Sequence, residues 1–499
     1  MRYASLPENF TNEKFDRVIS EFVKVLGHEH IHTDEKKLRR FSGFLISANV
    51  EDHMPSAAIF PERAEQVIEI VKICDTFKMP LWVSSTGKNI GYGAMAPCKK
   101  GTVMLSLRRM KRIIEINEEL CYALIEPGVT YKQLYDHIQE NDYRLWLNIP
   151  TGPTPIAGPV GTSLDRGTGY TPYGDNFEHV CGMEIILPEG EVVRTGMGGI
   201  SDSNCWQLYK WGYGPYLDGL FSQGNFGICV KMGVWLMPEP ADFRPFAITF
   251  SNREDLEQLV DTLRPLRLAN IIPNSCSIAP SYGEDYAGFW NIYAALYGHP
   301  QQIAVNWEIV TEAFSKFEGI GFFTEEQLGE HPSFQIRSNL MKGVVPAKPY
   351  SKFTHANWFV PIVPSQGKHV VKQKMLADEI IKSYGFSYNA ELIVGARSMH
   401  HVMEIPFNKK SVESIKKSGE CYLALIKEFA RNGYGLYRTN IAFMDAVGAT
   451  YGPAIRNVFS KIKRALDPNG IISPGKAGIV YSEGNRESLD EGASLTYFR

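Results

Sequence analysis

Three glycine-rich stretches lie far apart in the sequence, and each has the composition of an anion-binding loop. They run from Ser84 to Gly93, from Ala157 to Gly174, and from Gly224 to Ile228. Small residues let consecutive backbone N–H groups approach a phosphate closely, and hydroxyl side chains add further donors. Any one stretch could equally be a structural turn. Together they predict one large anionic ligand that is held at several points.

Other nucleotide-binding and metal-binding patterns are incomplete. No G-x-G-x-x-G motif follows a strand-like run, which argues against a Rossmann dinucleotide site. Residues 470–476 approach a P-loop, but Ala477 stands where Ser or Thr would hold magnesium. Alternating histidines in residues 28–32 would share one face of a strand, yet no carboxylate or cysteine partner is evident, so we favour a solvent-facing segment. The histidines of residues 400–404 lack the H-E-x-x-H order, and we predict no metal site.

The composition of the 499 residues is typical of a globular protein with more than one domain, since 44% are hydrophobic and 21% charged. A formal net charge of −3 offers no basic face for nucleic acid and no polybasic membrane anchor. No apolar run approaches the roughly 18 residues of a membrane-spanning helix, and the N-terminal segment lacks the apolar core of a signal peptide. The 8 cysteines form no C-x-x-C pair, which is typical of free thiols in a reducing compartment. We therefore expect a cytoplasmic protein.

Hydrophobic periodicity places these motifs on a mixture of helices and strands. Helical spacing is clearest at residues 13–26, 63–77, 130–142, 253–264, 301–318, 410–431 and 455–466. Strand-like runs begin at Pro80 and recur within 101–129, 182–195 and 226–237. Hairpin-like strands beside helices predict an α+β fold and argue against a regular parallel βαβ series. Changes in pattern near 238–243 and 436 predict domain boundaries.

Longer motifs also occur in order along the chain. They are S-T-G-K-N-x-G-Y-G (85–93), E-P-G-V-T (126–130), R-G-x-G-Y-T-P-Y-G-D (166–175), R-T-G-M-G-G (194–199), G-Y-G-P-Y-L-D-G-L-F-S-Q (212–223) and Y-R-T-N-I-A-F (437–443). The series resembles the vanillyl-alcohol oxidase / p-cresol methylhydroxylase flavoprotein family over nearly the whole chain. Residues 204–215 are more similar to the methylhydroxylase flavoprotein subunit than to the fungal oxidase. The resemblance implies a two-part FAD-binding domain, residues 1–239 and 437–499, with an α+β cap of residues 240–436 over the flavin ring.

The same resemblance implies that Tyr92, Tyr437 and Arg438 bind the phenolic oxygen of a substrate. The physical chemistry agrees with this role. Loss of a benzylic hydride from a neutral phenol would leave a cation, whereas a phenolate gives a neutral quinone methide. A fixed guanidinium and two phenol donors would stabilise that phenolate. The alternatives are that Tyr92 is a packing aromatic and that Arg438 belongs to a surface ion pair.

A carboxylate is also expected, to guide water onto the quinone methide. The fungal oxidase carries an aspartate before the R-G-x-G-Y motif, but this chain has P-T-G-P at residues 150–153, which argues against the oxidase mechanism. Glu391 and Glu404 fall where the methylhydroxylases carry acids, and they are the candidates. Either one could instead be a structural carboxylate.

The cofactor implied by the resemblance is FAD. The residues expected to bind it are Ser84, Ser85, Thr86, Gly87, Lys88, Asn89, Pro159, Val160, Gly161, Gly167, Tyr170, Gly227, Ile228 and Lys476. Family members attach FAD covalently through a tyrosine or a histidine upstream of an aromatic-rich strand, which corresponds to residues 357–361. His355 is displaced by one position from the histidine site, so we favour Tyr350 for a covalent bond, with noncovalent binding left open.

The leading functional expectation is hydroxylating oxidation of a 4-alkylphenol, with electrons passed to a c-type cytochrome. Trp358 would lie beside the flavin and shorten the electron route, or it simply packs the core of the cap. The alternatives are an oxidase that converts oxygen to hydrogen peroxide, a 2-hydroxyacid dehydrogenase, and a non-catalytic partner subunit. With a cytochrome partner we expect a homodimeric core or a heterotetramer, and joint export to the periplasm becomes an alternative location.

Overall fold

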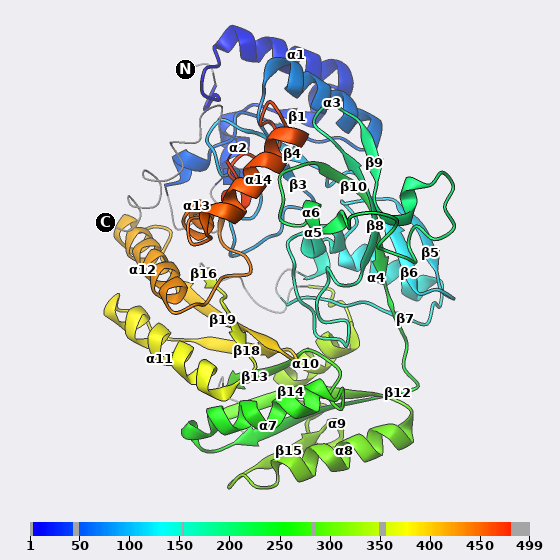
Figure 1. Cartoon of the computed structure of the whole chain (residues 1–499), viewed down its shortest axis with the longest axis vertical. Coiled ribbons are helices and arrows are strands. Elements are labelled where there is room, and N and C mark those ends of the chain that lie inside the picture. The colour runs from blue at the N-terminus through cyan, green and yellow to red at the C-terminus, as the bar shows by residue number, and fades with distance from the viewer. Residues whose placement is uncertain (1–2, 43–48, 152–153, 282–285, 349–355, 481–499) are drawn as a thin grey trace.

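The computed structural model describes residues 3–42, 49–151, 154–281, 286–348 and 356–480. Figure 1 shows two regions that follow one another along the long axis of the molecule. The upper region contains the N-terminal half of the chain and the last described helix, and the lower region contains the green and yellow segments between them.

A four-stranded sheet begins the upper region. Its strand order is β1 (Ile31–His32), β2 (Ala58–Ile59), β4 (Val103–Ser106) and β3 (Leu81–Ser84), with β4 parallel to both β2 and β3. Two amphipathic helices, α1 (Asn12–Leu26) and α3 (Ala64–Phe77), place Phe15 and Ile70 in the same apolar core as Leu81. The first glycine stretch begins where β3 ends.

A five-stranded antiparallel sheet completes the upper region. Its order is β5 (Ile113–Asn117), β6 (Tyr122–Ile125), β10 (Ile228–Trp235), β8 (Val180–Ile186) and β9 (Val192–Arg194). Every residue of the interior strand β8, between β10 and β9, is buried, which agrees with its nearly unbroken apolar sequence. The connections hold a short two-stranded pair and three helices: β7 (Leu145–Trp146) with β11 (Met237–Pro238), α4 (Tyr131–Glu140), α5 (Pro159–Leu164) and α6 (Asp218–Phe221). The second glycine stretch includes α5, and the third leads into β10.

An eight-stranded antiparallel sheet forms the lower region. Its order is β15 (Gly321–Thr324), β12 (Asp242–Phe250), β14 (Trp290–Gly298), β13 (Cys276–Pro280), β18 (Ala390–Val394), β19 (Ser398–Pro406) and β16 (Ala356–Phe359), and β17 (Ile362–Pro364) also pairs with β19. One face packs on α7 (Leu256–Leu268), α8 (Pro300–Phe314), α11 (Gly367–Ser383) and α12 (Val412–Arg431). The short helices α9 (Glu325–Leu328) and α10 (Pro332–Lys342) pack near the opposite face, around Ala247 and Tyr293.

Strand β19 shows how this sheet presents side chains to the upper region. Met399, Met403 and Ile405 are fully buried in cores that include α7, α11 and α12. Because side chains alternate along a strand, His400 and Glu404 point to the other face. That face lies toward the upper region.

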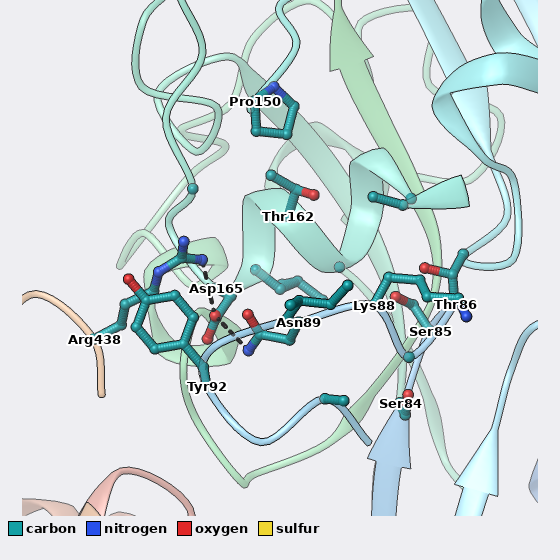
Figure 2. A pocket seen from close by; sticks show the side chains of 18 of the residues that line it. Ser84, Ser85, Thr86, Lys88, Asn89, Tyr92, Pro150, Thr162, Asp165 and Arg438 are labelled. Atoms are coloured by element: carbon teal, nitrogen blue, oxygen red, sulfur yellow. Dashed lines mark hydrogen bonds and ion pairs between the residues drawn. The ribbon is translucent and has the colours of Figure 1, made fainter. Parts of the chain in front are cut away.

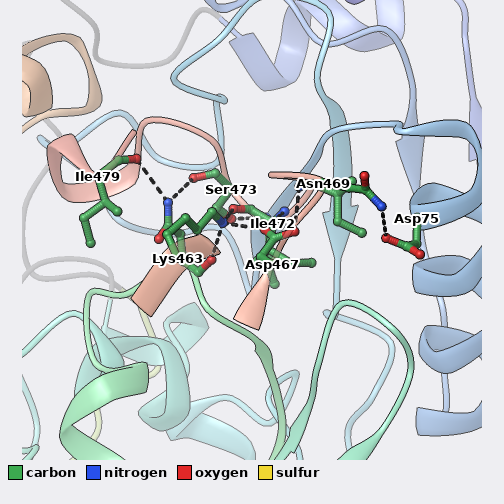
Figure 3. A network of polar contacts seen from close by, with 10 residues as sticks. Asp75, Lys463, Asp467, Asn469, Ile472, Ser473 and Ile479 are labelled. Atoms are coloured by element: carbon green, nitrogen blue, oxygen red, sulfur yellow. Dashed lines mark hydrogen bonds and ion pairs between the residues drawn. The ribbon is translucent and has the colours of Figure 1, made fainter. Parts of the chain in front are cut away.

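The C-terminal segment returns to the upper region through α13 (Met444–Gly448) and α14 (Pro453–Leu466). Near the end of α14, the fully buried Lys463 donates from Nζ to Oδ2 of Asp467 at 2.5 Å and to the carbonyl oxygen of Asn225 at 2.5 Å (Figure 3). Asn225 belongs to the third glycine stretch, so this ion pair fixes the end of α14 against it.

The residues after α14 run beside strand β3. The N–H of Leu81 donates to the carbonyl oxygen of Ile471 at 2.7 Å, and the N–H of Ser473 donates to the carbonyl oxygen of Leu81 at 2.7 Å. The side chain of Asn469 donates to Asp75 of α3 at 2.7 Å (Figure 3). The C-terminal segment therefore joins the first and third glycine stretches.

The elements confirm the α+β fold expected from the sequence. The strand that would align the histidines of residues 28–32, the alternative that we did not favour, is not observed, because His28–His30 forms a 3-10 turn and only Ile31–His32 pair in β1. The boundaries near 239 and 436 stay a prediction. Among the helices that the structure describes, none combines the length and apolar character needed to cross a membrane.

Candidate active site

A cavity of ≈ 560 Å³ lies where the upper region meets the large sheet of the lower region. Its walls come from all three glycine stretches, from the C-terminal segment, and from β16, β18 and β19. Segments that are distant in sequence therefore form one site, as the spacing of the glycine stretches predicts.

The first glycine stretch packs directly on α5 because two glycines of the second stretch lack side chains. A Cβ on Gly161 would lie 2.1 Å from Oγ of Ser85, and one on Gly158 would lie 2.9 Å from Cγ2 of Thr86. Gly87 itself has φ of +73°, a conformation that favours glycine. The glycines thus bring two backbones together along the cavity wall.

The charges on this wall suit an anionic ligand. Lys88 and Lys476 both line the cavity, and in the described residues neither forms an ion pair with a carboxylate. Burial lowers the pKa of Lys88, and the nearby charge of Arg108 lowers it further. An anion beside Lys88 would relieve both effects. The glycine-lined wall and the unpaired lysines fit the pyrophosphate of a dinucleotide.

Arg438 is the centre of an aromatic and acidic cluster at the other end of the glycine loop. Its guanidinium carbon lies 4.1 Å from the ring centroid of Tyr92 and 5.2 Å from that of Tyr437. Its Nη1 donates to Oδ2 of Asp165 at 3.2 Å, and the same oxygen accepts from Nδ2 of Asn89 at 2.9 Å (Figure 2). Nε of Arg438 is buried and has no hydrogen-bond partner among the described residues. Arg438 also lines the cavity, so its guanidinium can contact a ligand there.

At neutral pH the cluster contains a neutral tyrosine, Tyr437, and a charged guanidinium, Arg438. Burial raises the pKa of Tyr437 well above its ordinary value, although Arg438 opposes the shift. Burial alone would lower the pKa of Arg438, but Tyr437, Tyr92 and Asp165 raise it above its ordinary value. A neutral phenol donor and a charged guanidinium are the groups that would stabilise a bound phenolate.

Asn440 fixes the segment of Arg438 against the glycine loop. Its Nδ2 donates to Oδ1 of Asn357 at 3.1 Å and to the carbonyl oxygen of Gly91 at 3.4 Å. The N–H of Ile441 donates to the carbonyl oxygen of Tyr92 at 3.2 Å. These bonds explain why Tyr92 and Arg438, from distant parts of the sequence, face one another.

Both candidate carboxylates line the cavity from the large sheet, Glu391 from β18 and Glu404 from β19. Oε1 of Glu391 accepts from Nη1 of Arg337 at 2.8 Å. Arg337 is itself held by Oγ of Ser277 at 2.8 Å and lies 4.1 Å from the ring centroid of Tyr293. Glu391 therefore belongs to a fixed ion pair, which no pattern in the sequence indicates.

Two residues of the site were not among the sequence candidates for substrate binding. The ring of His400 meets that of Tyr437 edge-on, with centroids 4.5 Å apart. Burial, with a contribution from Arg438, lowers the pKa of His400 to about 4, so its imidazole is neutral near pH 7. Asp165 precedes a recognised motif, but nothing in the sequence connects it with Arg438.

Most of the site residues that the sequence predicts line the cavity. All five expected catalytic residues line the cavity, as do all the expected FAD-binding residues in the described chain except Pro159, which is buried at the first position of α5. Tyr350 and His355 lie outside the described residues. His401 cannot act as a free ligand, because Nδ1 contacts Gln373 at 3.0 Å and Nε2 contacts Tyr388 at 2.7 Å.

Known proteins with the same architecture include alkylphenol-oxidising flavoproteins. Residues 55–196 match a family model described as an FAD binding domain. The chain is 42% identical to the 4-cresol dehydrogenase [hydroxylating] flavoprotein subunit of Pseudomonas putida, over 95% of this chain and 98% of that protein. A crystal structure of p-cresol methylhydroxylase with substrate bound has a TM-score of 0.92 at 42% identity, covering 95% of this chain and 99% of that chain. The 4-ethylphenol oxidase from Gulosibacter chungangensis, in its isoeugenol complex, has a TM-score of 0.91 at 33% identity, covering 96% and 99%.

These matches span nearly the whole chain, and they agree with the glycine-lined cavity and its unpaired lysines in pointing to FAD. The chain belongs to the vanillyl-alcohol oxidase / p-cresol methylhydroxylase family of FAD-dependent oxidoreductases.

Proposed function

We propose that this protein oxidises 4-alkylphenols of the p-cresol type at the benzylic carbon and adds water there. The observation that carries the proposal is the cluster of Arg438, Tyr92 and Tyr437 in the wall of the FAD cavity. Two similar proteins are named for reactions on 4-cresol and 4-ethylphenol, which supports the same substrate class here.

Bound FAD would supply the acceptor for the hydride. Arg438, Tyr92 and Tyr437 would hold the phenolic oxygen as its anion, so that loss of a hydride from the benzylic carbon leaves a neutral quinone methide. Water then adds to that carbon and the phenolic oxygen regains a proton. An alkylphenol and water thus give a hydroxyalkylphenol, with two electrons and two protons released in total.

Glu391 and Glu404 are the proposed acid–base groups for the water. Both face the cavity from neighbouring strands, which are paired in antiparallel register. Because Arg337 pairs with Glu391, the Glu391 carboxylate has a fixed orientation. Glu404 lies opposite Trp358 across the β16–β19 ladder, on the cavity side of the sheet. A carboxylate that accepts a proton from water would assist its addition to the quinone methide.

The test is anaerobic mixing of the purified FAD-loaded protein with p-cresol. We expect the oxidised flavin absorbance to bleach and 4-hydroxybenzyl alcohol to form, with its new oxygen derived from isotopically labelled water. D-lactate serves as the control, because 2-hydroxyacid dehydrogenases share the fold. Bleaching by D-lactate and none by any 4-alkylphenol would overturn the proposal.

For the electron acceptor we propose a c-type cytochrome, since the 42% identical relative is named as the flavoprotein subunit of a larger enzyme. The assembly would be a homodimeric core or a heterotetramer with the cytochrome, located in the cytoplasm or exported with its partner. Oxygen is the competing acceptor, and the 33% identical oxidase favours it.

We also propose covalent attachment of FAD, with Tyr350 preferred over His355. Acid precipitation of the FAD-loaded protein should leave flavin in the pellet, and Tyr350→Phe should release it to the supernatant while His355→Asn should not. Complete release from the unaltered protein would rule out a covalent bond but not FAD binding.

A further inference from the structure

Asp165 lies between the phenol-binding cluster and the glycine loop. It follows α5, and its Oδ2 accepts from both Arg438, at 3.2 Å, and Asn89, at 2.9 Å. Figure 2 shows the carboxylate between these two side chains. In the described part of the chain, it is the carboxylate that forms an ion pair with Arg438.

The backbone around Asp165 is fixed. Its N–H donates to the carbonyl oxygen of Gly161 at 3.1 Å, at the end of α5. Nε2 of Gln223 donates to the carbonyl oxygen of Asp165 at 3.4 Å and to that of Tyr437 at 2.8 Å. One side chain thus joins the segment that carries Asp165 to the segment that carries Arg438, so the ion pair has a defined geometry.

The pair has two opposite consequences for a bound phenol. The carboxylate fixes the guanidinium, which favours binding in one orientation. Its negative charge also offsets the positive charge of Arg438, which makes ionisation of the phenol less favourable than beside a lone guanidinium. The two consequences can be separated, because asparagine keeps an acceptor oxygen and loses the charge.

We propose that Asp165 is a positioning residue that fixes Arg438 and sets the pH at which the bound phenol ionises. The inference rests on the proposed function, since it requires a phenol beside Arg438. The other ionisable groups that face this position are Tyr92 of the glycine loop, Tyr437, His400 of β19 and Tyr422 of α12.

Three of those neighbours, His400, Tyr437 and Tyr422, keep the same charge across the neutral range. Burial lowers the pKa of His400 to about 4, and burial raises the pKa values of Tyr437 and Tyr422. A titration between pH 5 and 9 that disappears without a phenol therefore belongs to the bound phenol. The Tyr92→Phe variant shows whether the observed titration belongs to the bound phenol, because that variant lacks the Tyr92 hydroxyl.

The experiment uses the FAD-loaded protein and 4-nitrophenol, which has no benzylic C–H bond and reports its ionisation through the phenolate absorbance band. Difference spectra against the phenol-free protein give the pH midpoint of the bound probe. The variants are Asp165→Asn, Asp165→Ala and Asp165→Glu, with Asp136→Asn on the surface of α4 as the matched control. Anaerobic flavin reduction by p-cresol is measured on each.

We expect Asp165→Asn to lower the midpoint by about one to two pH units, as removal of one nearby charge does at intermediate dielectric. Asp165→Glu, which keeps the charge, should retain a midpoint near that of the unaltered protein. Asp165→Ala should also slow flavin reduction at least about tenfold, because the guanidinium loses its fixed partner. Asp136→Asn should change neither quantity.

Two results would overturn the inference. One is an Asp165→Asn variant that binds 4-nitrophenol with an unchanged or raised midpoint. The other is an Asp165→Ala variant that reduces its flavin at the unaltered rate. If Asp165→Ala does not fold, Asp165→Asn still decides the charge effect, with Asp165→Glu as its charge-retaining control. A protein whose flavin is reduced by no 4-alkylphenol refutes the inference and the proposed function together. Missing binding of 4-nitrophenol, or a missing shift, with p-cresol oxidation intact refutes the inference alone.

Discussion

At the scale of single residues, the position of Arg438 explains why it suits a phenolate. Two aromatic rings and the carboxylate of Asp165 restrict the guanidinium, while its buried Nε has no partner among the described residues. Arg438 also lines the cavity, where its charge would stabilise a bound oxyanion. Binding and catalysis would therefore depend on the same side chain.

Arg438→Ala should slow reduction of the flavin by p-cresol about 10- to 150-fold, because a charged hydrogen bond of this kind contributes about 1.5–3 kcal/mol. The optimum of the reaction should move to higher pH, where more of the phenol is already ionised in solution. Anaerobic stopped-flow reduction measures both effects, with Arg431→Ala on the exposed face of α12 as the control. An unchanged reduction rate would remove Arg438 from the proposed mechanism.

Sequence patterns identified residues of the site whose roles follow from local motifs, but they missed residues that act through tertiary contacts. Tyr92, Tyr437 and Arg438 could be expected because each lies in a recognisable motif. The contact between His400 and Tyr437 and the ion pair between Asp165 and Arg438 join distant segments, and neither has a local signal. The arrangement of backbones decides such contacts.

At the scale of elements, glycines fix the position of the first loop. A Cβ on Gly91 would lie 1.8 Å from Cδ1 of Trp358, and its φ of +82° is unfavourable for other residues. The sequence indicated that this loop binds an anion. It did not show that Gly91 lets the loop pack on β16, or that glycines of the second stretch let it pack on α5, because these roles depend on which elements become neighbours.

Strand β19 carries an acid-sensitive group on its core side, opposite the cavity. Burial lowers the pKa of His401 to about 3, and Lys374 adds to the shift. In the unfolded chain a histidine has a pKa near 6.5, so between pH 6.5 and 3 the unfolded state binds the extra proton. The stability that depends on neutral His401 is therefore present above pH 6.5 and is lost as the pH falls, by about 1.4 kcal/mol per pH unit.

His401→Gln should consequently reduce the loss in the free energy of unfolding between pH 7 and pH 5. The substitution should also lower stability at pH 7 through altered packing. Urea midpoints at pH 7 and pH 5 measure the slope, and the exposed His28 provides the control variant His28→Gln. Equal slopes for His401→Gln and the unaltered protein would show that His401 is not the group that titrates.

At the scale of the whole molecule, the buried ion pair at the end of α14 joins the C-terminal segment to the FAD region. Nζ of Lys463 and the carboxylate of Asp467 are fully buried, and the N–H groups of Ile471 and Ile472 also donate to Asp467 at 2.9 Å. The loop that follows carries Lys476 to the cavity. We therefore expect loss of the ion pair to affect both the stability of this segment and the binding of FAD.

Lys463→Met should destabilise the fold by about 3–5 kcal/mol, because it leaves the carboxylate of Asp467 buried without its cation. FAD should also dissociate more readily, unless it is covalently bound. Thermal unfolding and flavin fluorescence in the flow-through of a filter measure the two effects. Lys461→Met, on the exposed face of the same helix, is the control, and equal behaviour of the two variants would contradict a role for the pair.

The sequence predicted the α+β class and the positions of most long helices, since these depend on local periodicity. It could not predict that residues after α14 would pair with β3, because the bond between Leu81 and Ile471 joins segments 390 residues apart. A strand through the histidines of residues 28–32 was the alternative that we did not favour, and the 3-10 turn at His28–His30 is too short for periodicity to predict.

The electron acceptor is a property of the whole assembly, because an electron must leave the cavity through the protein. Trp358 lines the cavity from β16, so it provides an aromatic side chain beside the flavin region. A net charge of −3 does not by itself select a cytochrome. We expect the reduced protein to be reoxidised at least about tenfold faster by cytochrome c than by oxygen at matched concentrations.

If Trp358 carries the electron, Trp358→Leu should slow the cytochrome reaction and leave the oxygen reaction unchanged. Trp358→Phe should preserve much of the rate of the cytochrome reaction. Reoxidation by oxygen that is faster by orders of magnitude would identify an oxidase, and equal losses in both reactions would assign Trp358 to packing against Gly91.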